Sequence, residues 1–129
     1  MIQSNELRIG NWVMYDNRLF QIEAISRSLP CLNTDEFGIG VVDWNNINPI
    51  PLTPEILEKC GLKNGNSELD RNVFYSTNKH LAQFSVNISG SFGIYVGVFI
   101  ALRSVHLEYL HQLQNLYFAL TNEELNYTP

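Results

Sequence analysis

Neutral polar side chains near the C-terminus are the residues whose type and spacing could do chemistry. They recur at i, i+3 and i+4 and are followed by an aromatic residue at i+7, so a helix would place all four on one side; the four residues are His111, Gln114, Asn115 and Phe118. Amides around an aromatic ring suit a desolvated protein contact, because a paired amide costs less to bury than a charge. The same pattern fits an internal hydrogen-bond network, for instance with residues 46–53, or a solvated surface. We predict these four residues as a candidate interaction face and keep all three roles open.

Histidines and cysteines give weaker chemical signals. His106 and His111 do not have the three- or four-residue separation of a helical metal pair. Cys31 and Cys60 belong to no CxxC motif, which favours two free thiols in a reducing compartment. Cys60 falls at the C-terminal end of a predicted helix, whereas thiolates are stabilised at N-terminal ends. We therefore predict no catalytic residue, no metal and no cofactor, and hence a protein that is not an enzyme.

The overall composition fits one small domain with few charges. The chain has 129 residues and only 16% charged residues, against about 25% in typical soluble domains. Low charge points to a protein partner or self-association, although abundant Asn, Gln and Ser could solvate the surface instead. The net charge is −5, and the eight Lys and Arg residues are scattered. This balance argues against a broad nucleic-acid surface, which needs clustered positive charge.

Hydropathy gives no reason to expect a membrane segment. The longest apolar run, residues 92–102, has 11 residues, whereas a membrane helix needs about 20. The first residues contain neither a basic stretch nor an apolar core of the kind found in signal peptides. We expect a cytoplasmic location and no membrane partner.

Short strands and turn signals dominate the first half of the chain. Alternation of apolar and polar residues predicts strands over 7–15, 19–25, 37–44 and 46–50, the first two joined by a turn at 16–18. A short helix is predicted over 53–60, because the sequence has residues that favour helix ends at both of its termini. Thr53 is a good N-cap, Pro54 a good first residue, and Gly61 can take the left-handed conformation that ends a helix.

The second half predicts a hairpin followed by a helix. Polar residues 63–72 form a loop that divides a single domain, 1–129, into sub-halves of about 1–62 and 73–129. Strands are expected over 73–75, 81–88 and 92–102, the last two as an antiparallel hairpin. A helix over 107–120 would pack on that hairpin, and Asn122 could take a left-handed conformation after it. The core face of this helix would comprise Tyr109, Leu110, Leu113, Leu116, Tyr117 and Leu120.

The strand-rich first half resembles the opening of SH3-like barrels. The resemblance lies in residues 10–15, the turn and the alternating residues 20–25. Some such barrels bind nucleic acids and others bind peptides, and the aromatic residues here could supply a stacking surface; they are Trp12, Tyr15, Phe20 and Trp44. The alternative is that these rings fill the barrel. The predicted fold class is α+β: a strand-rich, possibly SH3-like N-terminal half, a short helix, an antiparallel hairpin and a C-terminal helix.

Three segments resemble a family of short uncharacterised proteins of Bacteroides-type bacteria and their prophages. They are Leu7–Asn11, Pro49–Thr53 and His111–Thr121, followed by Glu123–Leu125. The family has no established activity, so the resemblance implies a phage-related setting and not a mechanism. Asn122 stands where the family pattern would have Gly. We expect a non-enzymatic protein-interaction or accessory module, with a nucleic-acid-associated regulator as the alternative.

Overall fold

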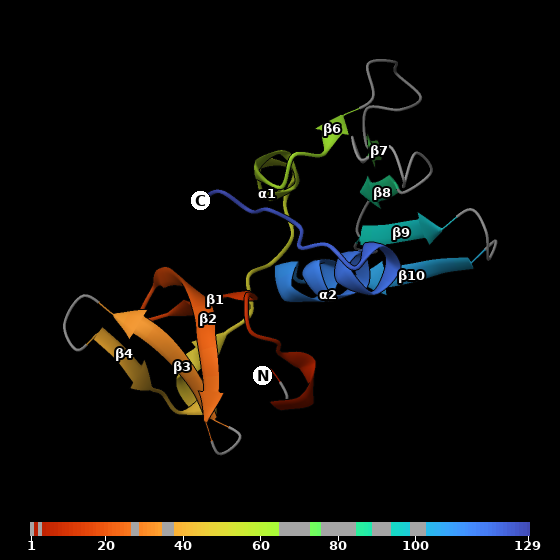
Figure 1. The fold of residues 1–129 in the computed structure, drawn as a ribbon. Helices are drawn as coiled ribbons and strands as arrows, with labels where there is room; N and C mark the ends of the chain where they lie inside the picture. Colours follow the sequence, from red (N-terminus) through yellow and green to blue (C-terminus); the bar gives the residue numbers. More distant parts are fainter. Residues whose placement is uncertain are drawn as a thin grey trace.

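The computed structural model describes residues 2, 4–26, 29–34, 38–64, 73–75, 85–88, 94–98 and 103–129. They form two antiparallel sheets, one in each half of the chain, with a short helix between them and a longer helix near the C-terminus (Figure 1). The predicted α+β class with a strand-rich N-terminal half is confirmed. None of the described helices is long and apolar enough to cross a membrane.

The N-terminal sheet has five strands in the spatial order β4-β3-β2-β1-β5. Two 3-10 turns, η1 and η2, accompany them. In chain order these elements are η1 Ser4–Glu6, β1 Trp12–Tyr15, β2 Arg18–Ser26, β3 Leu29–Thr34, β4 Gly38–Val41, η2 Trp44–Asn46 and β5 Ile47–Asn48. The chain therefore runs through four neighbouring antiparallel strands and returns through η2, so that β5 pairs beside β1.

A two-residue turn joins β1 to β2. Asp16 and Asn17 have φ of +50° and +59°, and positive φ at both central positions defines the type I′ turn, whose twist matches a hairpin. The register pairs Trp12 with Gln21 and Tyr15 with Arg18. The hairpin predicted from the turn signal is confirmed.

Several strand boundaries differ from expectation. The predicted strand 7–15 begins only at Trp12, because residues 9 and 10 form a turn. Strand β3 was not predicted, since Pro30 interrupts the polar and apolar alternation and residues on both of its faces are apolar. The predicted strand 37–44 is β4, and Trp44 lies instead in η2. The predicted strand 46–50 is reduced to β5, with Pro49 immediately after it.

The short helix α1, Pro54–Lys59, has the ends expected from its sequence. The Thr53 hydroxyl accepts a hydrogen bond from the N–H of Ile56 at 3.3 Å. At the other end Gly61 has φ of +83°, and the N–H of Leu62 donates to the carbonyl of Leu57 at 3.1 Å. A left-handed glycine followed by this bond is the Schellman ending, so the helix prediction is confirmed.

The C-terminal half contains a second five-stranded sheet, in the order β10-β9-β8-β7-β6. Its strands are β6 Lys63–Asn64, β7 Val73–Tyr75, β8 Ser85–Ile88, β9 Ile94–Val98 and β10 Arg103–Leu107. The antiparallel pairing of β8 with β9 confirms the described part of the predicted hairpin; residues 81–84, 89–93 and 99–102 lie outside the described residues. Strand β10 was not predicted, and β6 starts the sheet inside the segment expected to be a loop; residues 65–72 of that segment lie outside the described residues.

The last helix, α2, spans Leu110–Thr121, three residues later at its start than expected, because Leu107 belongs to β10. The Gln112 side chain accepts hydrogen bonds from the N–H groups of Glu108 and Tyr109, at 2.9 and 3.1 Å, and so caps its first turn. Asn122 follows the helix with φ of +58° and donates to the Phe118 carbonyl at 2.7 Å. The left-handed ending predicted at Asn122 is confirmed.

One hydrophobic cluster combines both halves of the chain. It brings residues of α1 and its flanks together with residues of α2 and the C-terminal segment. Trp12, Met14 and Leu19 of the N-terminal sheet pack against it. Its buried members are Ile50, Leu57, Cys60, Leu62, Leu107, Leu110, Leu113, Tyr117, Leu125 and Tyr127. Leu120, expected in this core, is exposed. The expected packing of α2 on β8 and β9 involves side chains outside the described residues.

A second cluster fills the inner face of the N-terminal sheet. Its buried members are Ile2, Leu7, Val13, Ile22, Leu32 and Ile47. They come from the first residues of the chain and from strands β1, β2, β3 and β5. The segment that leads into β1 connects the two clusters, because Leu7 belongs to the second cluster and Trp12 packs against the first.

Candidate functional site

The polar side of α2 lies against the residues that precede and begin β1. The Gln114 side chain is only 1% exposed. Its oxygen accepts a hydrogen bond from the N–H of Trp12 at 2.9 Å, and its nitrogen donates to the carbonyl of Gly10 at 3.2 Å. One helical amide therefore satisfies one donor and one acceptor of the approaching backbone, as a neighbouring strand would.

Asn115 makes a second set of contacts with the same segment. Its side-chain oxygen accepts from the side-chain nitrogen of Asn11 at 2.9 Å and from Nε of Arg8 at 3.0 Å. Its nitrogen donates to the carbonyl of Glu6 at 2.7 Å. Four side chains take part in these contacts, and we call them the amide junction: Arg8, Asn11, Gln114 and Asn115.

A tight turn presents the N-terminal side of the amide junction. The carbonyl of Arg8 accepts from the N–H of Asn11 at 3.1 Å, and Gly10 has φ of +97°, a conformation that glycine adopts without steric cost. The Asn11 side chain, fully buried, accepts from the N–H of Arg8 at 2.7 Å. The N–H of Gly10 donates to the Ile22 carbonyl at 2.9 Å, which fixes the turn to β2.

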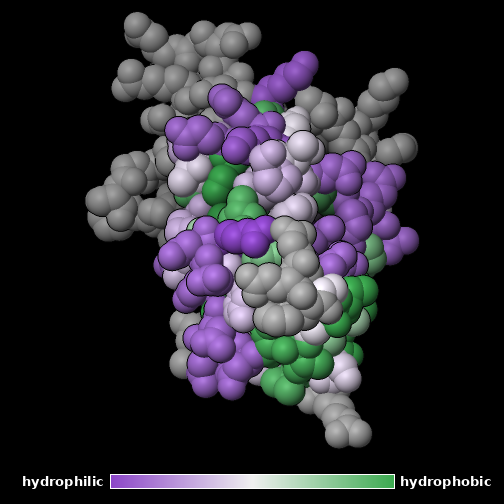
Figure 2. All heavy atoms as spheres, turned by 90° about the vertical axis from the view of Figure 1, so that its left-hand side faces the viewer, coloured by the Kyte–Doolittle hydropathy of each residue, from purple (hydrophilic) through white to green (hydrophobic). Residues whose placement is uncertain are grey.

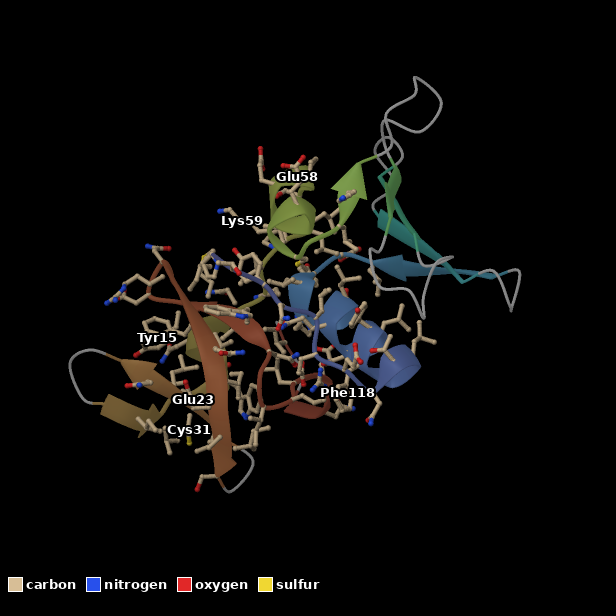
Figure 3. The ribbon with its side chains drawn as sticks, turned by 45° about the horizontal axis from the view of Figure 1, so that its top comes forward. Tyr15, Glu23, Cys31, Glu58, Lys59 and Phe118 are labelled. Carbon is tan, nitrogen blue, oxygen red and sulfur yellow. The ribbon has the colours of Figure 1, made fainter. Side chains whose placement is uncertain are left out.

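Arg8 joins the junction to the end of α2. Its guanidinium lies over the Phe118 ring, 4.3 Å from the ring centroid. It also donates to both carboxylate oxygens of Glu124, at 2.6 and 3.3 Å. Forked pairing with a carboxylate and stacking on a ring are properties of arginine that lysine lacks. Phe118 is therefore half-buried beneath Arg8, on the side of α2 that faces the N-terminal segment (Figure 3).

His111 is buried in the first turn of α2, with an exposed fraction of 1%. Its ring stacks on Tyr109 at a centroid distance of 5.9 Å. Neither ring nitrogen has a hydrogen-bond partner among the described residues. Burial lowers the pKa of His111 below its usual 6.5, because a charged imidazole loses its hydration, while the carboxylate of Glu6 acts in the opposite direction.

These contacts decide among the roles left open for the candidate interaction face. His111 and Gln114 are buried, and Asn115 and Phe118 are half-buried under Arg8 and Asn11. The four residues do not form an open surface; three of them contact the N-terminal segment. Gln114 and Asn115 belong to an internal hydrogen-bond network, and their partners lie in the segment 6–12 rather than in residues 46–53. That other segment contacts the chain before and at the start of α2 through backbone bonds, from Leu52 to Glu108 and from Leu110 to Ile50.

Both cysteines are free and buried. Burial raises the pKa of the Cys60 thiol to about 12, because desolvation disfavours the thiolate. Cys60 lines a shallow groove between the end of α1 and the C-terminal segment, together with Lys59, Tyr117 and Glu123. No histidine is among the described residues that line this groove.

The aromatic side chains of the N-terminal half do not share one surface. Trp12 packs edge-on against Tyr127 at 5.4 Å and belongs to the cluster around α2. Tyr15, Phe20 and Trp44 are half-buried against the inner cluster of the sheet. The rings fill the borders of two cores, which corresponds to the structural role that the sequence left open for them.

The most exposed apolar side chains of the N-terminal sheet lie on its edge strand. Ile39 and Val41 of β4 are 64% and 54% exposed and, being two residues apart, point to the same face. Cys31 of β3, labelled in Figure 3, is the register partner of Val41 and therefore lies on the same face. Viewed from the side of this sheet, hydrophobic residues gather at the lower right of the molecule (Figure 2). None of the described strands pairs with β4 on its other side.

Known proteins offer no closer guide to this site. No family model, no curated protein and no solved structure matches the chain. Among the residues that the structure describes, no three His, Cys, Asp or Glu side chains gather in a group that could hold a metal ion. The open edge of β4 and the closed amide junction are therefore the features from which a function must be argued.

Proposed function

We propose that the protein is a non-enzymatic interaction module that binds an extended protein segment at the open edge of β4. The observation that carries this proposal is the exposure of two β-branched side chains, Ile39 and Val41, on a strand whose outer edge no described strand covers. An open strand edge offers backbone donors and acceptors to an added strand, and the side chains beside it supply selectivity.

Composition supports this edge as a binding surface. Natural proteins protect open edges with charged residues or proline, but β4 reads Gly-Ile-Gly-Val and contains neither. Exposed β-branched residues on such an edge also lower solubility, so their presence favours a role of this edge in binding. The meander, the 3-10 turn before β5 and the pairing of β5 with β1 support the finer proposal that this half is an SH3-like barrel.

The setting of the module is part of the same proposal. The resemblance of three segments, Leu7–Asn11, Pro49–Thr53 and His111–Thr121, to prophage proteins supports an origin in a phage or mobile element, and the low content of cationic residues favours a protein partner over nucleic acid. The nucleic-acid alternative lacks a comparable observation, because the rings that it needs are packed into two different cores.

Selection from a library of extended peptides displayed on phage tests the proposal. Enriched peptides should alternate apolar and polar residues, bind the wild type and the Ile9→Lys variant, and fail to bind Ile39→Lys. Ile9 is a matched control, because it is an exposed isoleucine, 57% exposed, that lies outside β4. The absence of enriched peptides, or equal binding to Ile39→Lys, would overturn the proposal.

A further inference from the structure

Resting on the proposed function of the β4 edge, we propose that its partner is a second copy of this chain, paired antiparallel through β4 with Gly40 on the two-fold axis. The argument depends on which backbone groups of β4 point outward. The edge must present them in a pattern that is complementary to itself, because a two-fold interface uses the same surface on both copies.

The register between β3 and β4 determines those groups. The N–H of Val42 donates to the carbonyl of Pro30 at 3.0 Å, so residue 42 occupies a hydrogen-bonded position opposite Pro30. Bonded and non-bonded pairs alternate in an antiparallel ladder. Gly40, opposite Leu32, is therefore bonded to β3, whereas Val41 and Ile39 occupy non-bonded positions opposite Cys31 and Asn33. The N–H and C=O groups of Ile39 and Val41 point to the open edge.

A two-fold axis at Gly40 satisfies all of these groups. It places Ile39 opposite Val41 of the second copy, and Val41 opposite its Ile39, as two hydrogen-bonded pairs. Each such pair exchanges two backbone bonds, so every outward group of the two residues gains a partner. The same axis places the exposed side chains of Ile39 and Val41 beside those of the second copy on one face, where β-branched pairs stabilise a sheet.

Gly40 suits the position on the axis. It becomes a non-bonded pair with itself, in which Cα atoms approach to about 4.5 Å. A Cβ built on Gly40 meets no atom within 4 Å, so a side chain is tolerated there in the single chain. A cysteine at this position would meet its symmetry mate at a separation within the range of about 4.4–6.8 Å that a disulfide requires.

The area and charge of the interface set its strength. The described residues of β4 number four, and a strand pair of that length covers far less than the roughly 1,200 Å² of a stable complex. We therefore expect a reversible dimer with a dissociation constant on the order of 0.1 mM. Each copy carries a net charge of −5, so salt should strengthen the association by screening the repulsion between the copies.

Sedimentation over a dilution series of the full chain tests this proposal. The wild type and Ile9→Lys should dimerise at high concentration, and more strongly in salt. Ile39→Lys should remain monomeric, because a charge would enter the paired edge. Val41→Pro should weaken the dimer at least tenfold, because proline removes an outward N–H and no bond to β3. A monomeric wild type at every concentration, or a dimer that both edge variants retain, would overturn the proposal.

Oxidative cross-linking of Gly40→Cys tests the register. The variant should form a covalent dimer, whereas the wild type, which keeps both native cysteines, and Ile39→Cys should not, because residue 39 faces residue 41 of the other copy. Efficient cross-linking of Ile39→Cys would place the axis elsewhere and overturn the Gly40 register. Enriched peptides that bind to a monomeric protein would leave the proposed function intact and reject self-pairing. Failure of both experiments would reject the edge as a binding surface.

Discussion

The side-chain oxygen of Gln114 lies 2.9 Å from the backbone nitrogen of Trp12, across a separation of 102 residues. With the second bond from Gln114 to the Gly10 carbonyl, the helix α2 completes the backbone of a segment in the opposite half of the chain. The conformation of the N-terminal half at this point therefore depends on one amide near the C-terminus.

Replacement of Gln114 by leucine should destabilise the protein by roughly 1–3 kcal/mol, because the part-buried N–H of Trp12 loses its partner, whereas the Gly10 carbonyl keeps the hydrogen bond from Gln21. The urea midpoint of unfolding measures this loss. Gln21→Leu is the matched control: Gln21 also donates to the Gly10 carbonyl, at 2.9 Å, but is exposed, so water can replace it. An equal loss in both variants would contradict the importance of burial.

Replacement of Arg8 by lysine should cost about 1 kcal/mol or more, because lysine keeps the charge but loses the forked pairing with Glu124 and the stacking on Phe118. Chemical denaturation of Arg8→Lys and Glu124→Gln compares the two sides of the pair. Glu124→Gln should cost only about 0.5 kcal/mol, since the ion pair is partly exposed to solvent. A larger loss in Glu124→Gln would show that the ion pair dominates the role of Arg8.

The stability of the wild type should fall as the pH decreases below the usual histidine pKa of 6.5, because burial lowers the pKa of His111 in the folded protein. The unfolded chain then binds a proton that the folded chain resists, at up to about 1.4 kcal/mol per pH unit. Above that pH the effect vanishes. Denaturation of the wild type and His111→Leu over a pH series measures it. The difference in stability between them should shift toward the variant in acid, and parallel pH profiles would contradict the prediction.

Replacement of Asn122 by glycine should raise the thermal midpoint, with a gain of roughly 0.5–1 kcal/mol, because glycine takes the left-handed ending of α2 without strain. Asn122→Ala should lose about 1 kcal/mol for the opposite reason. Asn126→Gly is the control, since Asn126 is not among the described residues of positive φ. Glycine there should only increase the freedom of the unfolded chain and lower the midpoint.

Local signals in the sequence were enough to predict several elements. The caps of α1 depend on Thr53 and Gly61, and the first hairpin depends on the Asp16–Asn17 turn, all within a few residues of the structure that they determine. The left-handed conformation of Asn122 was likewise predicted from a local signal, its position directly after the last helix. Strand β3 was missed because Pro30 breaks its alternation and because Leu32 and Cys31 are buried on opposite faces.

The arrangement of the amide junction could not be predicted from such local signals. Helical spacing correctly placed Gln114 and Asn115 on one side of α2, but that spacing is the same for a buried and for an exposed surface. Whether this side of α2 is buried or exposed depends on the turn at Gly10 and on the distant segment that this turn brings to the helix. The exposed pair Ile39 and Val41 lies in the predicted strand 37–44, but the alternation that predicts a strand does not show whether its outer edge is paired.

The dependence of residues 8–12 on residues 114–127 also constrains the order in which the chain can fold. The Trp12 ring is covered by Tyr127, and its N–H is bound by Gln114. During synthesis, the N–H and ring of Trp12 can gain these partners only after residues 114–127 have left the ribosome. Closing so long a loop slows this step of folding, whereas the inner cluster of the N-terminal sheet needs only residues 2–47.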